Sequence, residues 1–305
     1  MRSPVSLSSF PSFLPPEVIQ LTEETSIQMA QQIQRIALKT PLCDAPIGTC
    51  YTQQGQSNTP LLLLQGFDSS LLEFRRLLPY LAPQQETWTV DLLGFGFCDR
   101  PPELPIDTEA LKIHLYHFWK TCIQRPMILG GASMGGATAL DFALTYPQAV
   151  EKLILLDSAG LAKRPIMGKF LFPPLERWAT DFLRSPKVRE SISRKAYYDP
   201  RFVTPDANLC AALHLACPRW SEALISFTKS GGYGSFVKFL PQIQQQALII
   251  WGKNDQILGT KDAPIFAQKL PNNQLIWIDQ CGHVPHLEQP QKVAQAILNW
   301  LSGAC

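Results

Sequence analysis

Hydrophobic positions along the chain form two kinds of pattern. Short, continuously apolar runs stand near 61–65, 87–93, 126–131, 151–157, 247–252 and 274–279. Stretches with apolar residues at helical spacing follow several of them, at 71–81, 107–122, 134–146 and 291–301. Apolar strands that alternate with helices are typical of a parallel sheet covered on both faces. The pattern therefore predicts an α/β fold with a mostly parallel, doubly wound sheet.

One long interval breaks this alternation. Between Asp157 and Ala247 the chain is helical and aromatic in pattern, without a comparable apolar run. About ninety residues are too many for a plain connection inside a compact domain. We therefore expect a helical cap inserted before the penultimate strand. The predicted division is an N-terminal extension at 1–30, a core at 31–158 and 246–305, and a cap at 159–245.

The beginning of the chain carries a helical pattern within 22–38. Early strands are expected near 34–41 and 47–54, before the first of the strongly apolar runs.

Composition narrows the classes of function. Hydrophobic residues make up 46% of the 305 residues and charged residues 17%, which is typical of a globular protein. A net charge of +2 gives no electrostatic footprint for nucleic acid, so no such partner is expected. No apolar run approaches the roughly 20 residues that span a bilayer. The first residues lack a convincing cleavage site, so the expected location is the cytoplasm.

Eight cysteines are present, without a CxxC pair, and we interpret them as reduced and mostly buried. Cys210, His214 and Cys217 share one face of a predicted helix. A zinc site would use such residues, but both pairing spacings typical of zinc sites are missing. We therefore interpret them as part of a buried stripe and expect no metal and no cofactor.

Ser133 stands directly between a buried strand and a helix, within Gly131-Ala132-Ser133-Met134-Gly135. This G-x-S-x-G pattern predicts a sharp turn that exposes the serine hydroxyl above the sheet. Small residues are expected at Gly131 and Gly135, because larger side chains would collide with neighbouring backbone. The pattern lacks the lysine of a phosphate-binding loop and the spacing of a dinucleotide turn.

A serine nucleophile needs a base, and a base needs an orienting acid. In this architecture they follow in the order serine, acid, histidine. Asp255 comes just after the next clear strand beyond the predicted cap, and His283 just after the last strand. Catalytic groups gather at the carboxyl ends of strands in open α/β sheets. Ser133, Asp255 and His283 are therefore the candidate catalytic residues.

The chain resembles the α/β-hydrolase superfamily over nearly its whole length. The stretches that carry the resemblance are "LLLLQGFDSS", "VDLLGFGFCDRP", "GGASMGG", "LIIWGKNDQIL" and "CGHVPHLEQP". It implies that His283 is the base, that Asp255 orients it, and that the N–H groups of Phe67 and Met134 form an oxyanion hole. The family usually has His-Gly before the oxyanion residue, whereas this chain has Gln65-Gly66. That departure bears on the geometry of the loop.

A further resemblance is carried by "GFDSSLLEFRRLLPYL", "TWTVDLLGFGF" and "HFWKTCIQRP". These stretches are similar to α/β-hydrolases of cyanobacteria and plant plastids, including members of the chlorophyll-dephytylase type. The expected function is a serine hydrolase that cleaves a carboxylic ester, with a largely apolar, lipid-like or phytyl-type substrate. Carbon–carbon bond hydrolysis, acyl transfer and a non-catalytic ligand-binding module remain alternatives. A clamp for a substrate carboxylate would favour the first of these, and cap arginines Arg177, Arg184 and Arg201 are candidates. Contact with a membrane surface through the cap stretch "PIMGKFLFPPLERW" stays open, as does the oligomeric state.

The remaining polar residues have structural interpretations. Asp157 ends a strand and could replace Asp255 as the acid, but a hydrogen-bonded strand end is the simpler interpretation. Asp91, Asp99 and Arg100 are expected to stabilise the turn around "GFG". His114 and His117 are expected to be satisfied histidines on an aromatic helix face. His286, three residues after His283, is expected to line the pocket rim or face solvent.

Overall fold

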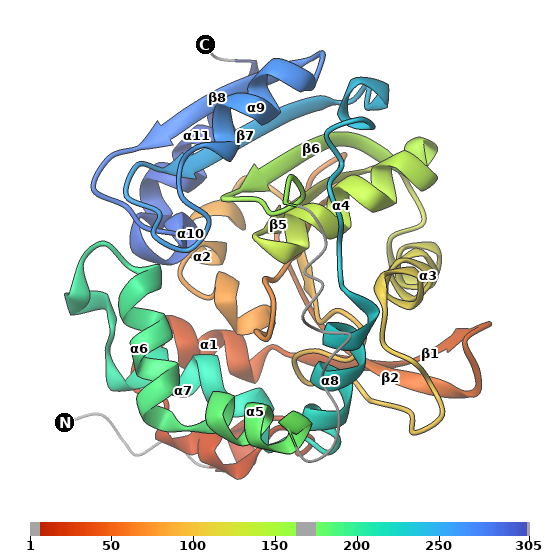
Figure 1. Cartoon of the computed structure of the whole chain (residues 1–305), viewed down its shortest axis with the longest axis vertical. Coiled ribbons are helices and arrows are strands. Elements are labelled where there is room, and N and C mark those ends of the chain that lie inside the picture. The colour runs from red at the N-terminus through yellow and green to blue at the C-terminus, as the bar shows by residue number, and fades with distance from the viewer. Residues whose placement is uncertain (1–6, 163–174, 304–305) are drawn as a thin grey trace.

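The computed structural model describes residues 7–162 and 175–303. Within them, eight strands form one sheet in the order β1-β2-β4-β3-β5-β6-β7-β8 (Figure 1). The β1–β2 and β2–β4 pairs are antiparallel and all other pairs are parallel, which confirms the mostly parallel sheet. The strands are β1 Gln34–Thr40, β2 Cys43–Gln54, β3 Leu61–Leu64, β4 Thr87–Val90, β5 Met127–Ala132, β6 Val150–Leu156, β7 Gln246–Gly252 and β8 Asn273–Ile278.

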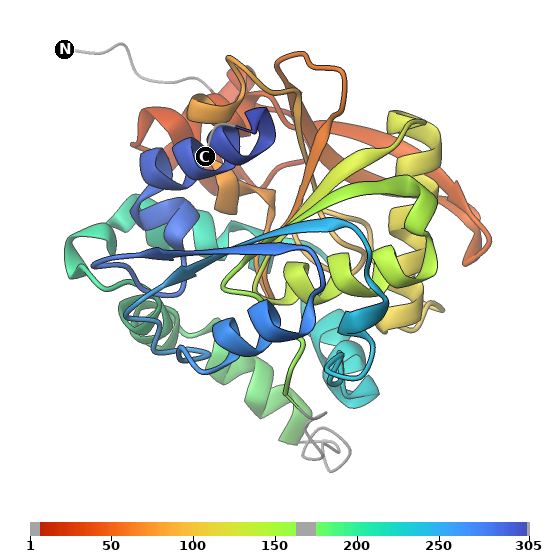
Figure 2. The same ribbon diagram turned by 90° about the horizontal axis from the view of Figure 1, so that it is seen from above.

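Helices cover both faces of the sheet. The α-helices are α1 Glu24–Gln31, α2 Leu78–Leu81, α3 Thr108–Phe118, α4 Met134–Thr145, α5 Leu175–Arg184, α6 Pro186–Ala196, α7 Pro205–Ala212, α8 Trp220–Ser230, α9 Asp262–Lys269, α10 Pro285–Glu288 and α11 Pro290–Ser302. Shorter turns include the 3₁₀ segments η3 Leu71–Phe74 and η8 Leu213–Ala216, and the π-helical η4 Trp119–Ile123. Figure 2 shows α4 and α9 on one face of the sheet and α11 with the N-terminal elements on the other. This is the doubly wound arrangement that the alternating pattern predicted.

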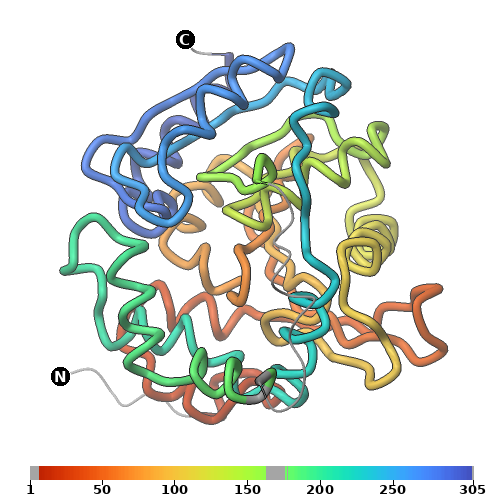
Figure 3. The backbone as a smooth tube through the Cα atoms, viewed as in Figure 1, coloured from red at the N-terminus to blue at the C-terminus, as the bar shows by residue number. Residues whose placement is uncertain are grey.

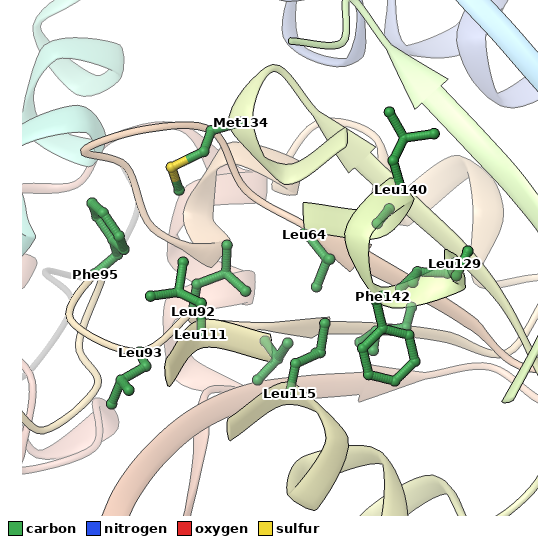
Figure 4. Close-up of a cluster of buried hydrophobic side chains, with 14 of the residues drawn as sticks. Leu64, Leu92, Leu93, Phe95, Leu111, Leu115, Leu129, Met134, Leu140 and Phe142 are labelled. Carbon is green, nitrogen blue, oxygen red and sulfur yellow. The ribbon is translucent and has the colours of Figure 1, made fainter. Parts of the chain in front are cut away.

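Alternating strand residues supply the two cores. In β3, Leu62 and Leu64 pack with the α3 and α4 side, whereas Leu61 and Leu63 pack with the α11 side. All four are fully buried, because a strand covered on both faces leaves no position for a polar side chain. Figure 4 shows the first core around Leu64, Leu115 and Phe142. The two cores hold the central strands rigidly, and the ends of those strands carry the candidate site.

The long interval between β6 and β7 contains α5, α6, α7 and α8 as its described helices. These helices gather at one end of the molecule, away from the sheet's helical layers (Figure 1). The chain therefore does leave the sheet after β6 and return at β7, as the missing apolar run predicted.

The N-terminal segment joins this cap. Asp206 of α7 accepts the backbone N–H groups of Thr22 and Glu23 and the hydroxyl of Ser26. These bonds satisfy donors at the start of α1, where Glu23 provides no side-chain cap of its own. Figures 1 and 3 show the N-terminal elements beside the cap helices.

The helix predicted within 22–38 is shorter than expected, because the strand predicted near 34–41 is present and holds the residues that the two predictions share. It ends at Gln31, and the chain from Gln34 to Thr40 pairs with β2 instead. The reason is tertiary: these residues gain ladder hydrogen bonds in β1 that outweigh their local helical pattern.

The register of the sheet brings several strand ends together. Ala132 of β5 pairs with Leu156 of β6, and Leu156 pairs with Ile250 of β7. Gly252 of β7 in turn pairs with Ile278 at the end of β8. The loops that follow these strands therefore leave the sheet at one edge.

Candidate active site

Ser133 occupies a strained turn between β5 and α4. Its φ is 50° and its ψ is −116°, a left-handed conformation that costs a non-glycine residue about 1–3 kcal/mol. Neighbouring backbone holds it in place: the Ser133 N–H donates to Leu156, and the Ser133 carbonyl accepts from Gly136 and Ala159, each at 3.0 Å. The hydroxyl-bearing residue is therefore presented on a rigid support.

The turn requires glycine on both sides, as the pattern predicted. A Cβ on Gly131 would lie 2.2 Å from the backbone of Gly135. A Cβ on Gly135 would lie 2.1 Å from the carbonyl oxygen of Leu64. Both distances are far below van der Waals contact, so neither position has room for a side chain.

The loop after β3 passes beside Ser133. A Cβ built on Gly66 would lie 3.5 Å from Cβ of Ser133. Within residues 7–162 and 175–303, the N–H groups of Phe67 and Met134 have no hydrogen-bond acceptor. The Met134 N–H is the first of α4, at the positive end of the helix dipole. The two residues expected to form an oxyanion hole thus both offer unused donors.

Gln65 replaces the usual histidine without loosening this loop. In the amide orientation that satisfies both of its atoms, it donates to the Val90 carbonyl at 2.9 Å and accepts from the Leu92 N–H at 3.0 Å. These bonds tie the end of β3 to the end of β4. The next residue, Gly66, donates its N–H to Glu73 at 3.0 Å.

Asp255 and His283 form a hydrogen-bonded pair. Oδ2 of Asp255 lies 2.8 Å from Nδ1 of His283. The other carboxylate oxygen, Oδ1, accepts the N–H groups of Ile257 and Leu258 at 2.7 and 3.0 Å. Burial alone would raise the pKa of Asp255, but the bond and charge of His283 and these N–H groups outweigh it and lower the pKa. The Asp255 carboxylate is therefore held ionised and oriented toward His283.

A third acid, Asp157, stands beside this pair. Its Oδ1 accepts the Gly252 N–H at 3.0 Å, whereas its buried Oδ2 has no partner among the described residues. Burial and the negative charge of Asp255 raise the pKa of Asp157 well above its ordinary value. A protonated Asp157 can donate a hydrogen bond to Asp255, which would satisfy Oδ2. The expected hydrogen bond at a strand end is present, and Asp255 rather than Asp157 contacts the histidine.

Ligand-type atoms of Asp157, Asp255 and His283 lie within 4.8 Å of one another, the one such set in the part of the chain that the structure describes. The Asp255–His283 bond and the position of Asp157 beside it account for this clustering. Cys210, His214 and Cys217 do not converge in this way. His214 instead lies 3.2 Å from a carboxylate oxygen of Asp68.

Ser133 and His283 line the same pocket, whose volume is about 290 Å³. Phe67 of the β3 loop lines it as well. Its apolar lining includes residues from the cap and from the loops after β7 and β8, among them Ile192, Ala196, Tyr197, Ile257, Val284 and Leu287. Phe67, Ile192 and Ile257 are each more than 40% exposed, so the mouth of the pocket is also apolar.

Two arginines line the pocket, and the sequence pattern identified neither. Arg189 pairs with Asp68 at 2.6 Å. Arg75 donates to the Leu72 carbonyl, while its Nε and Nη2 are buried without a partner among the described residues. No sequence pattern marks either arginine as a pocket residue, because Arg75 lies in a helical run and Arg189 in the cap. Only the folded structure brings them to the pocket.

Two of the three cap arginines named from the sequence lie outside the pocket. Arg184 stacks over the Trp220 ring at 4.9 Å, and Arg201 pairs with Asp199. Neither lines the pocket. The side chain of Arg177 falls outside the described residues, as does most of the stretch "PIMGKFLFPPLERW".

The expectation for His286 is wrong. Its side chain is fully buried, with Nε2 2.9 Å from a carboxylate oxygen of Glu73. Its ring also contacts that of Phe74, at a centroid distance of 5.3 Å. α10 begins at Pro285 and turns this side chain inward, where the buried Glu73 carboxylate needs a partner. Sequence spacing carries no sign of this pairing.

Asp91 and Arg100 stabilise the turn as expected, whereas the side chain of Asp99 contacts β1 and β2 instead. Asp91 accepts the N–H groups of Leu71 and Phe97, and burial raises its pKa to about 7. Arg100 donates to three carbonyls in the "GFG" turn. Asp99 accepts the Gly48 N–H and pairs with an arginine of β1.

Two other histidines also stand apart from the pocket. His114 is buried against Thr49 Oγ1 at 2.8 Å, and burial lowers its pKa to about 3. His117 is half-buried and contacts the Tyr116 ring. Both are satisfied histidines, as the helix face predicted.

None of the described helices has the length and apolar character that crossing a membrane requires.

Comparisons with known proteins identify the family and the fold. Residues 61–296 match the model of the alpha/beta hydrolase family. Alpha/beta hydrolase domain-containing protein VTE7 of Arabidopsis thaliana is 33% identical, over 96% of this chain and 91% of its own. Lipase 1 of Psychrobacter immobilis is 27% identical, over 80% of this chain and 77% of its own.

Among solved structures, the meta-cleavage product hydrolase CumD of Pseudomonas fluorescens IP01 is similar, with a TM-score of 0.74 and 20% identity. The match covers 89% of this chain and 98% of that one. At that identity the likeness concerns the fold. With a family model that spans most of the chain and relatives that are lipases and hydrolases, the protein is a hydrolase that belongs to the alpha/beta hydrolase family.

Proposed function

We propose that the protein hydrolyses a carboxylic ester through a triad of Ser133, Asp255 and His283. The observation that carries this proposal is the 2.8 Å hydrogen bond between Asp255 and His283. His283 lines the same pocket as Ser133. A histidine held by an ionised carboxylate is a suitable base for a serine hydroxyl.

In the proposed reaction, Ser133 Oγ attacks the acyl carbon while Nε2 of His283 takes its proton. Negative charge develops on the former carbonyl oxygen, and the N–H groups of Phe67 and Met134 stabilise it. His283 then gives the proton to the departing alcohol, which leaves an acyl-enzyme. Water, deprotonated by the same histidine, releases the acid and restores Ser133. Asp255 stays ionised throughout and stabilises the imidazolium.

The substrate class follows from the pocket walls. Apolar residues from the cap and from two core loops surround the candidate nucleophile, and the mouth is apolar as well. Burying hydrocarbon against such walls contributes about 25 cal/mol per Å². We therefore infer that the acyl or alcohol part is largely hydrocarbon, as in a lipid or phytyl-type ester. The segment 159–245 would act as the cap that shapes this pocket.

The charges at the pocket support ester cleavage over carbon–carbon bond hydrolysis of a diketone-type acid. That reaction needs a cation free to bind the substrate carboxylate. Arg189 is neutralised by Asp68, and the partnerless nitrogens of Arg75 are shut off from solvent. Neither offers an accessible clamp in this arrangement.

A fluorophosphonate probe and a p-nitrophenyl ester test the proposal together. We expect the wild-type protein to be labelled at Ser133 and to release p-nitrophenol, and Ser133→Ala to do neither. A panel of esters with acyl chains of increasing length, and phytyl esters, then measures kcat/KM. Absence of both labelling and turnover would contradict the hydrolase mechanism and favour a binding module. Turnover of a vinylogous diketone acid alone would favour carbon–carbon bond hydrolysis.

A further inference from the structure

Asp68 follows the candidate oxyanion residue Phe67 directly and is itself 7% exposed. Its φ is 51°, so the chain reverses into a left-handed conformation right after the Phe67 peptide. Asp tolerates this conformation better than most residues. The side chain points away from bulk solvent, where a carboxylate is stable only with close partners.

All three side-chain partners of the Asp68 carboxylate come from the cap. Arg189 of α6 donates to Oδ2 at 2.6 Å, and Trp220 of α8 donates to Oδ1 at 2.7 Å. Nε2 of His214, in η8, lies 3.2 Å from Oδ1. Arg189 reaches further, to the Asp68 carbonyl at 3.2 Å and to the Ala211 carbonyl at 2.6 Å. Three cap elements thus converge on one residue of a core loop.

The protonation states of Asp68 and His214 are consistent with the hydrogen bonds between the loop and the cap. Burial would raise the pKa of Asp68, but His214, Arg189 and Trp220 outweigh it and lower the pKa. Burial lowers the pKa of His214, so this histidine is neutral at pH 7. The cluster then holds one negative charge, on Asp68, and one positive charge, on Arg189. The other Asp68 oxygen, Oδ1, faces the neutral side chains of Trp220 and His214.

The core holds the residues on the other side of Phe67. Gln65 is tied to the end of β4, and the Gly66 N–H is tied to Glu73. Phe67 therefore lies between a residue fixed by the core and a residue fixed by the cap. Its own ring contacts Phe227 of α8, at a centroid distance of 5.9 Å. The orientation of the Phe67 N–H depends on both attachments.

Resting on the ester hydrolysis proposed above, we propose that Asp68 is a positioning residue that fixes the Phe67 N–H in the oxyanion hole through its hydrogen bonds to the cap. The cap then does more than enclose substrate. It completes the group of donors that stabilises the developing negative charge.

The test compares Asp68→Asn with Ser226→Ala in the full-length protein. Asn keeps the shape and the left-handed preference but removes the charge that Arg189 binds. Ser226 accepts the Ile106 N–H at 2.8 Å, so its removal breaks a different bond between cap and core, one that involves none of residues 65–69. Trp220→Phe serves as a milder variant, since it deletes one donor to Asp68 and keeps an aromatic ring.

Turnover of the p-nitrophenyl ester is the first measurement. Losing one oxyanion donor typically costs ~10²–10³ in rate, so Asp68→Asn should lower kcat by about a hundredfold, with KM within about threefold. The rate of Ser133 labelling should fall in parallel. Trp220→Phe should lower kcat by about three- to tenfold, as expected for one hydrogen bond. Ser226→Ala should keep wild-type kcat.

Hydrogen exchange of a peptide covering residues 65–69 is the second measurement, and it does not depend on activity. Exchange should rise in Asp68→Asn and stay at the wild-type level in Ser226→Ala. Raised KM with unchanged kcat would make Asp68 a substrate contact, and equal losses in both variants would make it a general cap anchor. Either result overturns the proposal.

The failure of the proposed function looks different. A wild-type protein that neither turns over ester nor labels at Ser133 would remove the reaction. Hydrogen exchange would still decide whether Asp68 fixes the loop at residues 65–69. Unchanged exchange in Asp68→Asn would show that Asp68 does not fix it. If Asp68→Asn does not fold, Trp220→Phe carries the same comparison.

Discussion

Glu73 joins His286 to the loop beside Ser133. One oxygen of its carboxylate lies 2.9 Å from Nε2 of His286, and the other accepts the Gly66 N–H at 3.0 Å. Burial would raise the pKa of Glu73, but His286, the Gly66 N–H and the Ser69 side chain outweigh it and lower the pKa. The second histidine of "CGHVPHLEQP" is thereby connected to the residue before Phe67, although it does not line the pocket.

Replacing His286 should destabilise the fold. His286→Ala removes the partner of a buried carboxylate and leaves a cavity, so the free energy of unfolding should fall by about 3 kcal/mol. Urea unfolding at pH 7 measures this. His117→Ala is the control, with an expected change within about 1 kcal/mol because that ring is only half-buried. A His286→Ala protein as stable as wild type would show that the Glu73 pair contributes nothing.

Replacing His283 or Asp255 should abolish turnover without unfolding the protein. His283→Ala should lower kcat by about 10³ or more, and Asp255→Asn by about 10³–10⁴, because the histidine loses its orienting charge. Asp279→Asn is the matched control, since Asp279 pairs with Lys253 in the same region and is exposed. Activity in His283→Ala near that of this control would contradict the triad.

The raised pKa of Asp157 predicts a specific pH dependence of stability. In the unfolded chain this carboxyl ionises near its ordinary value, whereas the folded protein keeps it protonated. Its contribution is therefore fully present below pH ~4 and is lost as pH rises. Asp157→Asn cannot ionise, so its stability relative to wild type should improve between pH 4 and pH 8. Urea unfolding of both proteins at the two pH values decides this, and a difference that does not change with pH would mean that Asp157 is ionised in the fold.

Gly135 should tolerate no side chain. In Gly135→Ala the new methyl group would meet the Leu64 carbonyl at 2.1 Å, which should cost about 3 kcal/mol or more and distort the Ser133 turn. Gly66→Ala is the comparison, since its nearest neighbour would be 3.5 Å away. Thermal unfolding and the rate of Ser133 labelling report the two effects. Similar melting temperatures for the two variants would contradict the steric argument.

Much of this arrangement could be predicted from the sequence, because local patterns determine it. The run into Ser133 is a strand followed by a helix, and glycines on both sides identify the turn. Asp255 and His283 each follow a recognisable strand, and parallel strands carry their ends to one edge. The register of β5, β6 and β7 confirms that edge.

The supporting contacts could not be predicted, because no local pattern marks them. Asp68 and Trp220 are 152 residues apart, and Asp68 and Arg189 are 121 apart. His286 was expected to line the pocket rim or face solvent, yet its side chain turns inward to a buried carboxylate in η3. Such pairs depend on where the cap and the last helices settle on the sheet, and a single sequence carries no record of that.

The bonds of Asp206 also bear on the order in which the chain folds. Thr22 and Asp206 are separated by 184 residues, so the start of α1 is synthesised long before its partner. Until the cap emerges, those N–H groups lack their native acceptor. Long-range contacts of this kind form late and slowly. The start of α1 therefore leaves the ribosome well before Asp206 and is capped only after the cap segment has followed it.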